Sequence, residues 1–150
     1  MEYRRATAKD IEAFVQNRIE FVTSIREVAD IESFEKNTKE YLKKNINSDE
    51  LIIMIAVNNN DIIASCMACV FKTVPLPSCL SGKTAEILNV YTKAEHRKKG
   101  YAKKLLQLAI EEAKKIGVEK IILEYTDEGL NLYKTLGFLI SEKQMQLKLK

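Results

Sequence analysis

The chain has 150 residues, of which 46% are hydrophobic and 30% charged, as is usual for one globular domain with a sizeable core. Its formal net charge of +3 is too small to indicate a nucleic-acid-binding protein by itself. No apolar run reaches the length of a signal peptide or a membrane span, and three cysteines do not suggest a disulfide framework. We therefore expect a single domain over residues 1–150, located in the cytoplasm and without a membrane partner.

The first half of the chain predicts a strand, two helices and a hairpin. Residues 1–7 resemble a short strand, and apolar residues then recur at helical spacing: Ile11, Phe14, Val15, Ile19 and Val22. A more polar helix is predicted over residues 31–44. The uninterrupted apolar run 51–57 is typical of a strand that is covered on both faces, and a turn at 58–61 leads to a return strand over 62–70.

The second half alternates strands and helices. Two prolines force an extended loop near residues 74–77, and residues 84–92 predict a strand. A helix with one apolar face follows from Ala102 and ends at Gly117. Residues 120–125 predict a strand, and a short helix runs from Leu130 to a stop at Gly137. The alternating tail 144–150 predicts a last strand, which gives the order β-α-α-β-β-β-α-β-α-β.

The junction between the strand 84–92 and the helix from Ala102 carries the clearest chemical signal. A helix start presents unpaired backbone N–H groups and the positive end of the helix dipole, and diphosphate groups bind well there. Gly100 lets the backbone approach a ligand closely, and Arg97, Lys98 and Lys99 add positive charge. The spacing alone is equally compatible with a solvated basic loop that contains an ordinary turn glycine.

Two motifs resemble those of the GNAT superfamily of N-acetyltransferases. The run Arg97-x-x-Gly100-x-Ala102, preceded by Leu88-x-Val90, resembles its acetyl-CoA signature. About thirty residues later, Leu132-Tyr133-Lys134-Thr135-Leu136-Gly137-Phe138 is similar to the end of a helix in that family. The resemblance in element order covers nearly the whole chain, although residues 12–48 and 72–83 match only loosely.

The resemblance implies an α/β (α+β) fold, the acyl-CoA N-acyltransferase fold. This fold has a mixed, mostly antiparallel central sheet of six to seven strands with about four helices. It also implies acetyl-CoA as cosubstrate without a metal. The pantetheine arm would lie along the strand, and the diphosphate would sit on backbone N–H groups of the loop. The residues placed at the cofactor in this way are Leu88, Asn89, Val90, Tyr91, Arg97, Lys98, Lys99, Gly100, Tyr101, Ala102 and, on the short helix, Asn131.

Tyr133 matches the general acid of the family. A neutral phenol with a pKa of about 10 can protonate the thiolate that leaves when an amine is acetylated. Alternatively, Tyr133 is a core aromatic residue, because Leu130 and Leu136 share its helix face.

Glu86 is the only carboxylate in the strand 84–92, and its position resembles that of the catalytic base in one branch of the family. It could equally be a glutamate at a solvent-lined strand position, with ordered water as the base instead.

Other suggestive patterns do not indicate chemistry. Cys66 and Cys69 are three residues apart within a strand, so they should point to opposite faces, and zinc would need two further ligands. Residues 81–84 mimic the end of a phosphate-binding P-loop, but position 77 is proline where a glycine is required.

The acceptor is expected to be an amine of a small molecule or peptide. No nucleic acid is expected as a partner, since only Tyr101 could stack on bases within the basic cluster. The tail strand could pair with a second copy to form a homodimer. The competing function is a non-catalytic module that binds or senses acyl-CoA.

Overall fold

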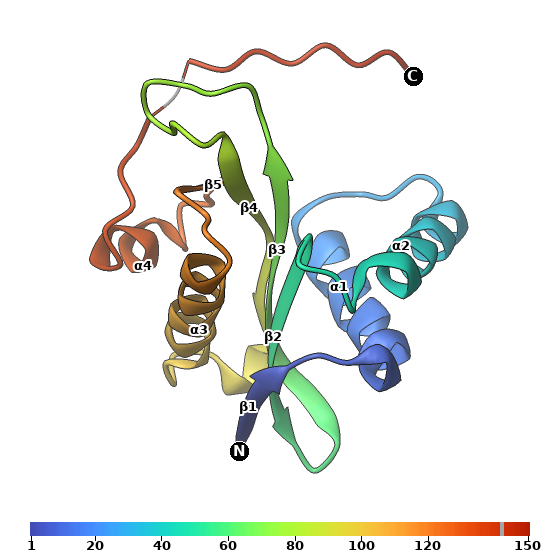
Figure 1. Cartoon of the computed structure of the whole chain (residues 1–150). Coiled ribbons are helices and arrows are strands. Elements are labelled where there is room, and N and C mark those ends of the chain that lie inside the picture. Colours follow the sequence, from blue (N-terminus) through green and yellow to red (C-terminus); the bar gives the residue numbers. More distant parts are fainter. Residues whose placement is uncertain (142) are drawn as a thin grey trace.

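The computed structural model describes residues 1–141 and 143–150, and these form one five-stranded sheet with helices on both faces (Figure 1). The strands lie in chain order: β1 (Glu2–Arg5), β2 (Leu51–Asn58), β3 (Asp61–Lys72), β4 (Lys83–Thr92) and β5 (Lys120–Leu123). Neighbouring strands are antiparallel except β4 and β5, which run parallel because α3 carries the chain from one to the other.

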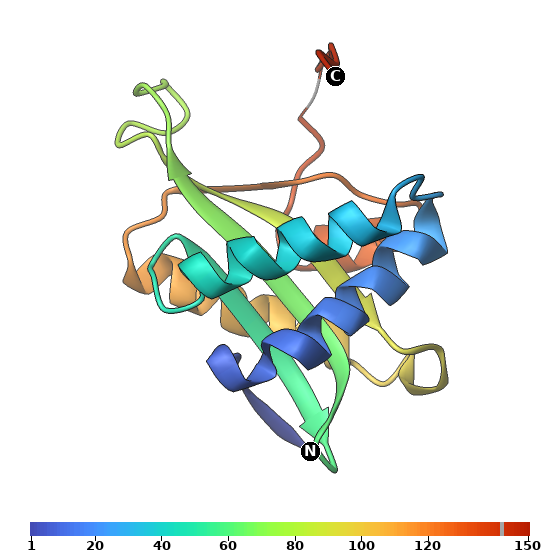
Figure 2. The ribbon, with the colours of Figure 1, turned by 90° about the vertical axis from the view of Figure 1, so that its right-hand side faces the viewer.

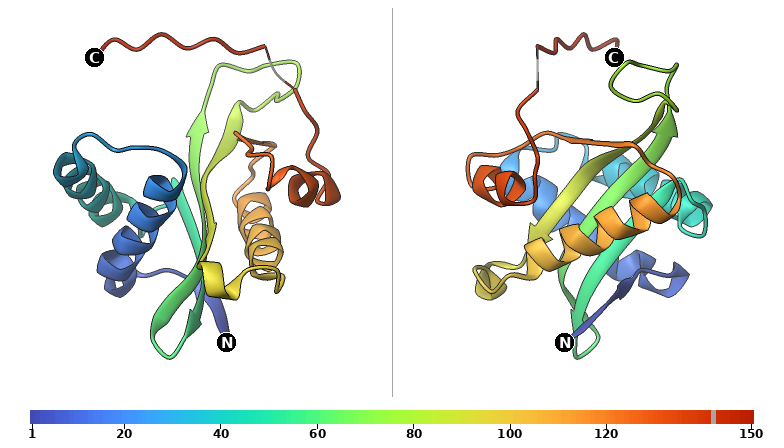
Figure 3. Two further views of the ribbon diagram at one scale, coloured as in Figure 1. Left: turned by 180° about the vertical axis from the view of Figure 1, so that it is seen from behind. Right: turned by 60° about the vertical axis from the view of Figure 1, so that its left-hand side comes forward.

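The helices form a layer on each face of the sheet. Helices α1 (Ile11–Ile25) and α2 (Ile31–Asn45) cover one face (Figure 2). Helices α3 (Tyr101–Lys115) and α4 (Leu130–Thr135) cover the other (Figure 3). The short 3-10 turns η1 (Ala8–Asp10) and η2 (Ala94–His96) precede α1 and the loop before α3. No helix in these described parts of the chain is both long and apolar enough to cross a membrane.

The uninterrupted apolar sequence of β2 follows from the two helical layers. Its residues alternate between two hydrophobic clusters: Ile52, Met54 and Ala56 face α3, whereas Ile53, Ile55 and Val57 face α1. Both faces of the strand are therefore removed from water, as the sequence predicts. Cys66 and Cys69 of β3 likewise pack into different clusters, so the prediction that they point to opposite faces is confirmed.

The fold class and the four helices are confirmed, but the predicted number of strands is wrong. The sheet of the described residues has five strands instead of six to seven, because residues 143–150 form none. The tail extends away from the sheet (Figure 1), and Met145, Leu147 and Leu149 are 101%, 83% and 89% exposed. Alternation fixes which side chains share a face, but a strand also needs a neighbour for its backbone hydrogen bonds.

Candidate active site

Strands β4 and β5 separate partway along β4. The ladder between them runs from Thr84 opposite Lys120 to Ile87 opposite Leu123 and ends there, whereas β4 continues to Thr92. On this side, the backbone groups of residues 88–92 have no neighbouring strand among the described residues. The sheet therefore offers a free strand edge that a ligand with amide groups can pair with.

A bulge at Leu88 sets which side chains of β4 face which helical layer. Asn89 lies opposite Met67 of β3 and Ile87 opposite the next residue, Ala68, so Leu88 has no partner on β3. Ile87 packs in the cluster under α3, whereas the Asn89 amide lies on the α1 face and donates to Ser65 Oγ at 2.8 Å. Glu86 also faces the α1 and α2 side, because it neighbours Ile87 and pairs with Cys69. Without the bulge, residues three apart would point to opposite faces.

The loop that leads from β4 into α3 turns its backbone amides outward. Lys98 and Gly100 have φ angles of +61° and +84°, in the left-handed region. The backbone N–H groups of Gly100, Tyr101, Ala102 and Lys103 have no hydrogen-bond acceptor among the described residues, and Lys104 N is the first to bond back, to the Gly100 carbonyl. Four adjacent donors at the positive end of a helix are a candidate site for an anion.

The space in front of this turn is open. A Cβ atom built on Gly100 would meet no atom within 4 Å. Arg97, Lys98 and Lys99 are exposed, and Arg97 Nε donates to the Thr92 carbonyl at 3.0 Å, which ties the loop to the end of β4. The free edge of β4 therefore leads directly to the amides at the start of α3.

Tyr101 contributes its backbone to this turn, while its ring belongs to the core. The ring packs between Tyr3 and His96, with centroids 6.3 Å and 6.4 Å away. Ala102 is half-buried beside it.

Tyr133 of α4 is held by close packing. Its ring makes an edge contact with Phe138, with centroids 5.8 Å apart, and a Cβ atom at Gly129 would lie only 2.8 Å from its Cε2 atom. Burial, and secondarily the nearby Cys66 thiol, raise the pKa of Tyr133 to about 12. The phenol is therefore neutral at physiological pH and able to donate a proton.

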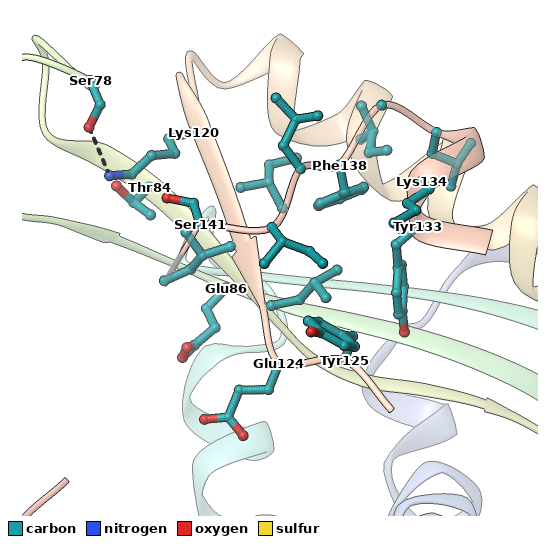
Figure 4. A pocket seen from close by; sticks show the side chains of 18 of the residues that line it. Ser78, Thr84, Glu86, Lys120, Glu124, Tyr125, Tyr133, Lys134, Phe138 and Ser141 are labelled. Carbon is teal, nitrogen blue, oxygen red and sulfur yellow. Dashed lines mark hydrogen bonds between the residues drawn. The ribbon is translucent and has the colours of Figure 1, made fainter. Parts of the chain in front are cut away.

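A cavity of about 1020 Å³ brings Glu86 and Tyr133 to one space beside β5 (Figure 4). Glu86 enters from β4 and Tyr133 from α4, with β5 running between them. The loop residues 97–102 do not line this cavity, so the candidate anion site and the two candidate catalytic groups occupy different parts of the molecule, linked by β4.

The remaining predicted cofactor residues lie around β4 and α4. Val90 packs against the cluster under α3, and Leu88 is 44% exposed at the bulge. The ring of Tyr91 packs on Phe21 at 5.9 Å, on the α1 side, so Tyr91 and Asn89 present only their backbones to the free edge. Asn131 is exposed on α4.

A buried polar chain on the α1 face was not predicted from the sequence. Arg18 Nη1 donates to Asn89 Oδ1 and to the Leu88 carbonyl, both at 3.2 Å. Asn89 donates to Ser65, Ser65 donates to Asn17 Oδ1, and Asn17 Nδ2 donates to the Ile62 carbonyl at 3.5 Å. A signal was present: Asn17 is a polar residue three positions after Phe14 on the apolar stripe of a helix.

Metal-binding side chains do not gather in this region. In residues 1–141 and 143–150, no group of three or more histidine, cysteine, aspartate or glutamate residues is arranged to hold a metal ion.

Comparison with known proteins relates this geometry to one family. Residues 19–138 match the profile of the acetyltransferase (GNAT) family. A comparison with curated protein sequences gave no match.

Among solved structures, a predicted acetyltransferase from Clostridium acetobutylicum with acetyl-CoA is 29% identical, with a TM-score of 0.85 over 99% of this chain and 96% of that one. A GCN5-related N-acetyltransferase from Ralstonia eutropha is 20% identical, with a TM-score of 0.86 over 99% of both chains. A glucosamine-6-phosphate N-acetyltransferase from Arabidopsis thaliana is 19% identical, with a TM-score of 0.75 over 99% of this chain and 98% of that one.

Proposed function

Because this chain belongs to the GNAT family of acetyltransferases, we propose that it transfers the acetyl group of acetyl-CoA to a primary amine of a small molecule or peptide. One observation carries the proposal: the free edge of β4 at residues 88–92 leads directly to the unpaired amides of residues 100–103. A molecule with a chain of amide groups and a diphosphate matches both features. Acetyl-CoA is such a molecule.

The residues present fit this cosubstrate. The backbone of residues 88–92 would pair with the pantetheine amides, and the N–H groups of residues 100–103 would hold the diphosphate. The open space in front of Gly100 leaves room for phosphate oxygens, and Arg97, Lys98 and Lys99 supply positive charge. Bound acetyl-CoA supplies an activated acetyl thioester.

Glu86 would take up the proton of the transfer, and Tyr133 would stabilise the leaving sulfur. The amine nitrogen forms a bond to the acetyl carbon, the bond from that carbon to sulfur breaks, and the electron pair leaves with sulfur. The Glu86 carboxylate accepts the proton from the amine, directly or through water, on the α1 and α2 side of β4. The Tyr133 phenol donates a hydrogen bond to the departing thiolate sulfur from the opposite side.

The pKa of Tyr133 suits this role. At about 12, it lies above that of a free thiol, which is about 8.5. Tyr133 thus stays protonated across the physiological range and stabilises the charge that develops on sulfur by donating a hydrogen bond, while sulfur, the weaker base, leaves as thiolate.

Two measurements test the function. Isothermal calorimetry should detect binding of acetyl-CoA, and free thiol should be released from acetyl-CoA when a panel of primary amines is supplied. Binding without thiol release on any amine would contradict the enzyme and favour a module that only senses acyl-CoA. Absence of binding would contradict the site itself.

Glu86→Gln tests the base. We expect turnover to fall about tenfold or more, with binding of acetyl-CoA retained. Unchanged turnover would assign the proton to ordered water instead.

A further inference from the structure

Arg18 lies on the α1 and α2 side of β4, the side from which Glu86 would receive the amine. It projects from α1 to the bulge of β4, where its Nη1 atom donates to the Leu88 carbonyl at 3.2 Å. Its guanidinium carbon lies 5.7 Å from the centroid of the Phe34 ring of α2. The side chain is therefore enclosed by α1, α2 and β4, and burial lowers the pKa of Arg18.

Within the described residues, this cation has no carboxylate partner. No Asp or Glu oxygen there lies within 4.0 Å of its nitrogens, whereas Lys39 and Lys93 each have one and Arg4 has two. Its hydrogen bonds go to one carbonyl and one side-chain amide, both through Nη1. A half-buried cation without a counter-ion loses hydration without full compensation, which an anionic ligand would restore.

The other nitrogens of the guanidinium face accessible space. Every fully buried side-chain nitrogen or oxygen in the described parts of the chain has a hydrogen-bond partner. Nε and Nη2 of Arg18 have none there, so they retain access to solvent. These two atoms form one edge of the planar guanidinium, the edge that can bind a carboxylate or phosphate through two parallel hydrogen bonds.

The bulge places Arg18 and Glu86 on the same face of β4. Asn89, to which Arg18 donates, shares the α1 and α2 side with Glu86 because Leu88 is the extra residue between them. Along β4, the backbones of Glu86 and Asn89 are three residues apart, or about 10 Å. An amine directed at Glu86 would therefore place a nearby substituent within reach of Arg18.

Resting on the function proposed above, we infer that the acceptor is an amine that carries an anionic oxygen group, a carboxylate or a phosphate, and that Arg18 binds this group. Asn89, Ser65 and Asn17 position the guanidinium from behind. Polycationic acceptors such as polyamines are disfavoured, because a second positive charge would lie beside Arg18.

Matched pairs of amines test the inference. Alanine carries a carboxylate where alaninamide carries an uncharged amide. O-phosphoethanolamine and glucosamine 6-phosphate each carry a phosphate that ethanolamine and glucosamine lack. With thiol release as the readout, we expect kcat/KM for the anionic member of at least one pair to exceed that of its neutral partner by about 10- to 100-fold. A preference confined to carboxylates or to phosphates identifies which anion is used.

Arg18→Gln should remove this preference, because glutamine is polar but carries no charge. Arg18→Lys should retain part of it. Lys43→Gln, a charge removal at an exposed position of α2, is the control and should leave the preference unchanged. Calorimetry with acetyl-CoA and the melting temperature establish that each variant is folded and binds the cosubstrate.

A second readout separates this inference from the function on which it rests. Calorimetry with protein saturated with free CoA measures binding of each amine without turnover. Binding of an anionic amine by the wild-type chain but not by Arg18→Gln supports the inference, even if no amine releases thiol. Absence of thiol release would contradict only the enzymatic function. Equal use of anionic and neutral members, or a preference that survives Arg18→Gln, would overturn the inference and leave the acetyltransferase standing.

Discussion

The two sides of β4 offer different kinds of groups to a ligand. Toward the start of α3, the candidate groups are backbone amides at Gly100 and the residues after it, with exposed basic side chains around them. Toward α1 and α2, they are side chains brought together from three elements: Asn17 and Arg18 of α1, Ser65 of β3, and Glu86 and Asn89 of β4. Binding a ligand through backbone amides needs little more than a glycine and a helix start. Binding it through side chains depends on each of the residues that hold those side chains in place. The cofactor side is thus expected to behave alike across relatives, and the acceptor side to be particular to this chain.

The largest expected effect is a loss of affinity for acetyl-CoA, caused by a change on the cofactor side of β4 alone. Gly100→Glu adds a strained side chain and a negative charge in front of the free amides, because Gly100 has a φ angle of +84°. We expect affinity for acetyl-CoA to fall about 100-fold or more by calorimetry. Gly117→Glu is a close control, since Gly117 has the same φ angle and equally open space but lies beyond the other end of α3. Similar losses in both variants would refute the amide site.

Tyr133→Phe tests the chemical step separately from the binding of acetyl-CoA. The hydroxyl is lost while the ring contacts with Phe138 and Gly129 remain, so we expect kcat to fall about tenfold or more at unchanged affinity for acetyl-CoA. Because the pKa of Tyr133 is raised to about 12, the phenol stays protonated at lower pH. The ratio of wild-type to variant rates should therefore be constant from about pH 6 to pH 10. A ratio that declines within this range would show that Tyr133 titrates there and is not the buried acid.

Ser65→Ala tests the acceptor side through its connecting residue. Ser65 accepts from Asn89 and donates to Asn17, and it is fully buried, so its removal leaves two buried amides short of a partner. We expect the free energy of unfolding to fall by about 1–3 kcal/mol in denaturant titrations. KM for the acceptor should rise while the Kd of acetyl-CoA stays the same, because Arg18 loses support. An increase in the Kd of acetyl-CoA would show that the two sides of β4 are not independent.

The turn before α3 can be located from the sequence, whereas the polar chain that ends at Arg18 cannot, for a physical reason. A strand, a loop with Gly100 and a helix are local in sequence, so spacing alone locates the turn, and the motif around Tyr133 is equally local. Arg18 and Asn89 are 71 residues apart, and no local pattern joins them. The bulge at Leu88 also reverses the alternation, which places the Asn89 side chain on the α1 face where strict alternation would put it beside Ile87. The predicted strand over residues 144–150 is wrong for a different reason. Apolar and polar residues do alternate there, but alternation does not show whether a neighbouring strand is available for pairing.

The smallest expected effect concerns the packing that aims Tyr133. Gly129 has ordinary helical backbone angles, so Gly129→Ala should not strain the backbone, but its methyl group would lie 2.8 Å from Tyr133 Cε2 and push the ring aside. We expect kcat to fall about three- to tenfold with affinity for acetyl-CoA unchanged. The double variant Gly129→Ala/Tyr133→Phe should be no slower than Tyr133→Phe, because Gly129 acts only through the position of the phenol. If the losses in kcat of the two single variants add up in the double variant, Gly129 has a role of its own. Its backbone would then contact a ligand directly on the cofactor side.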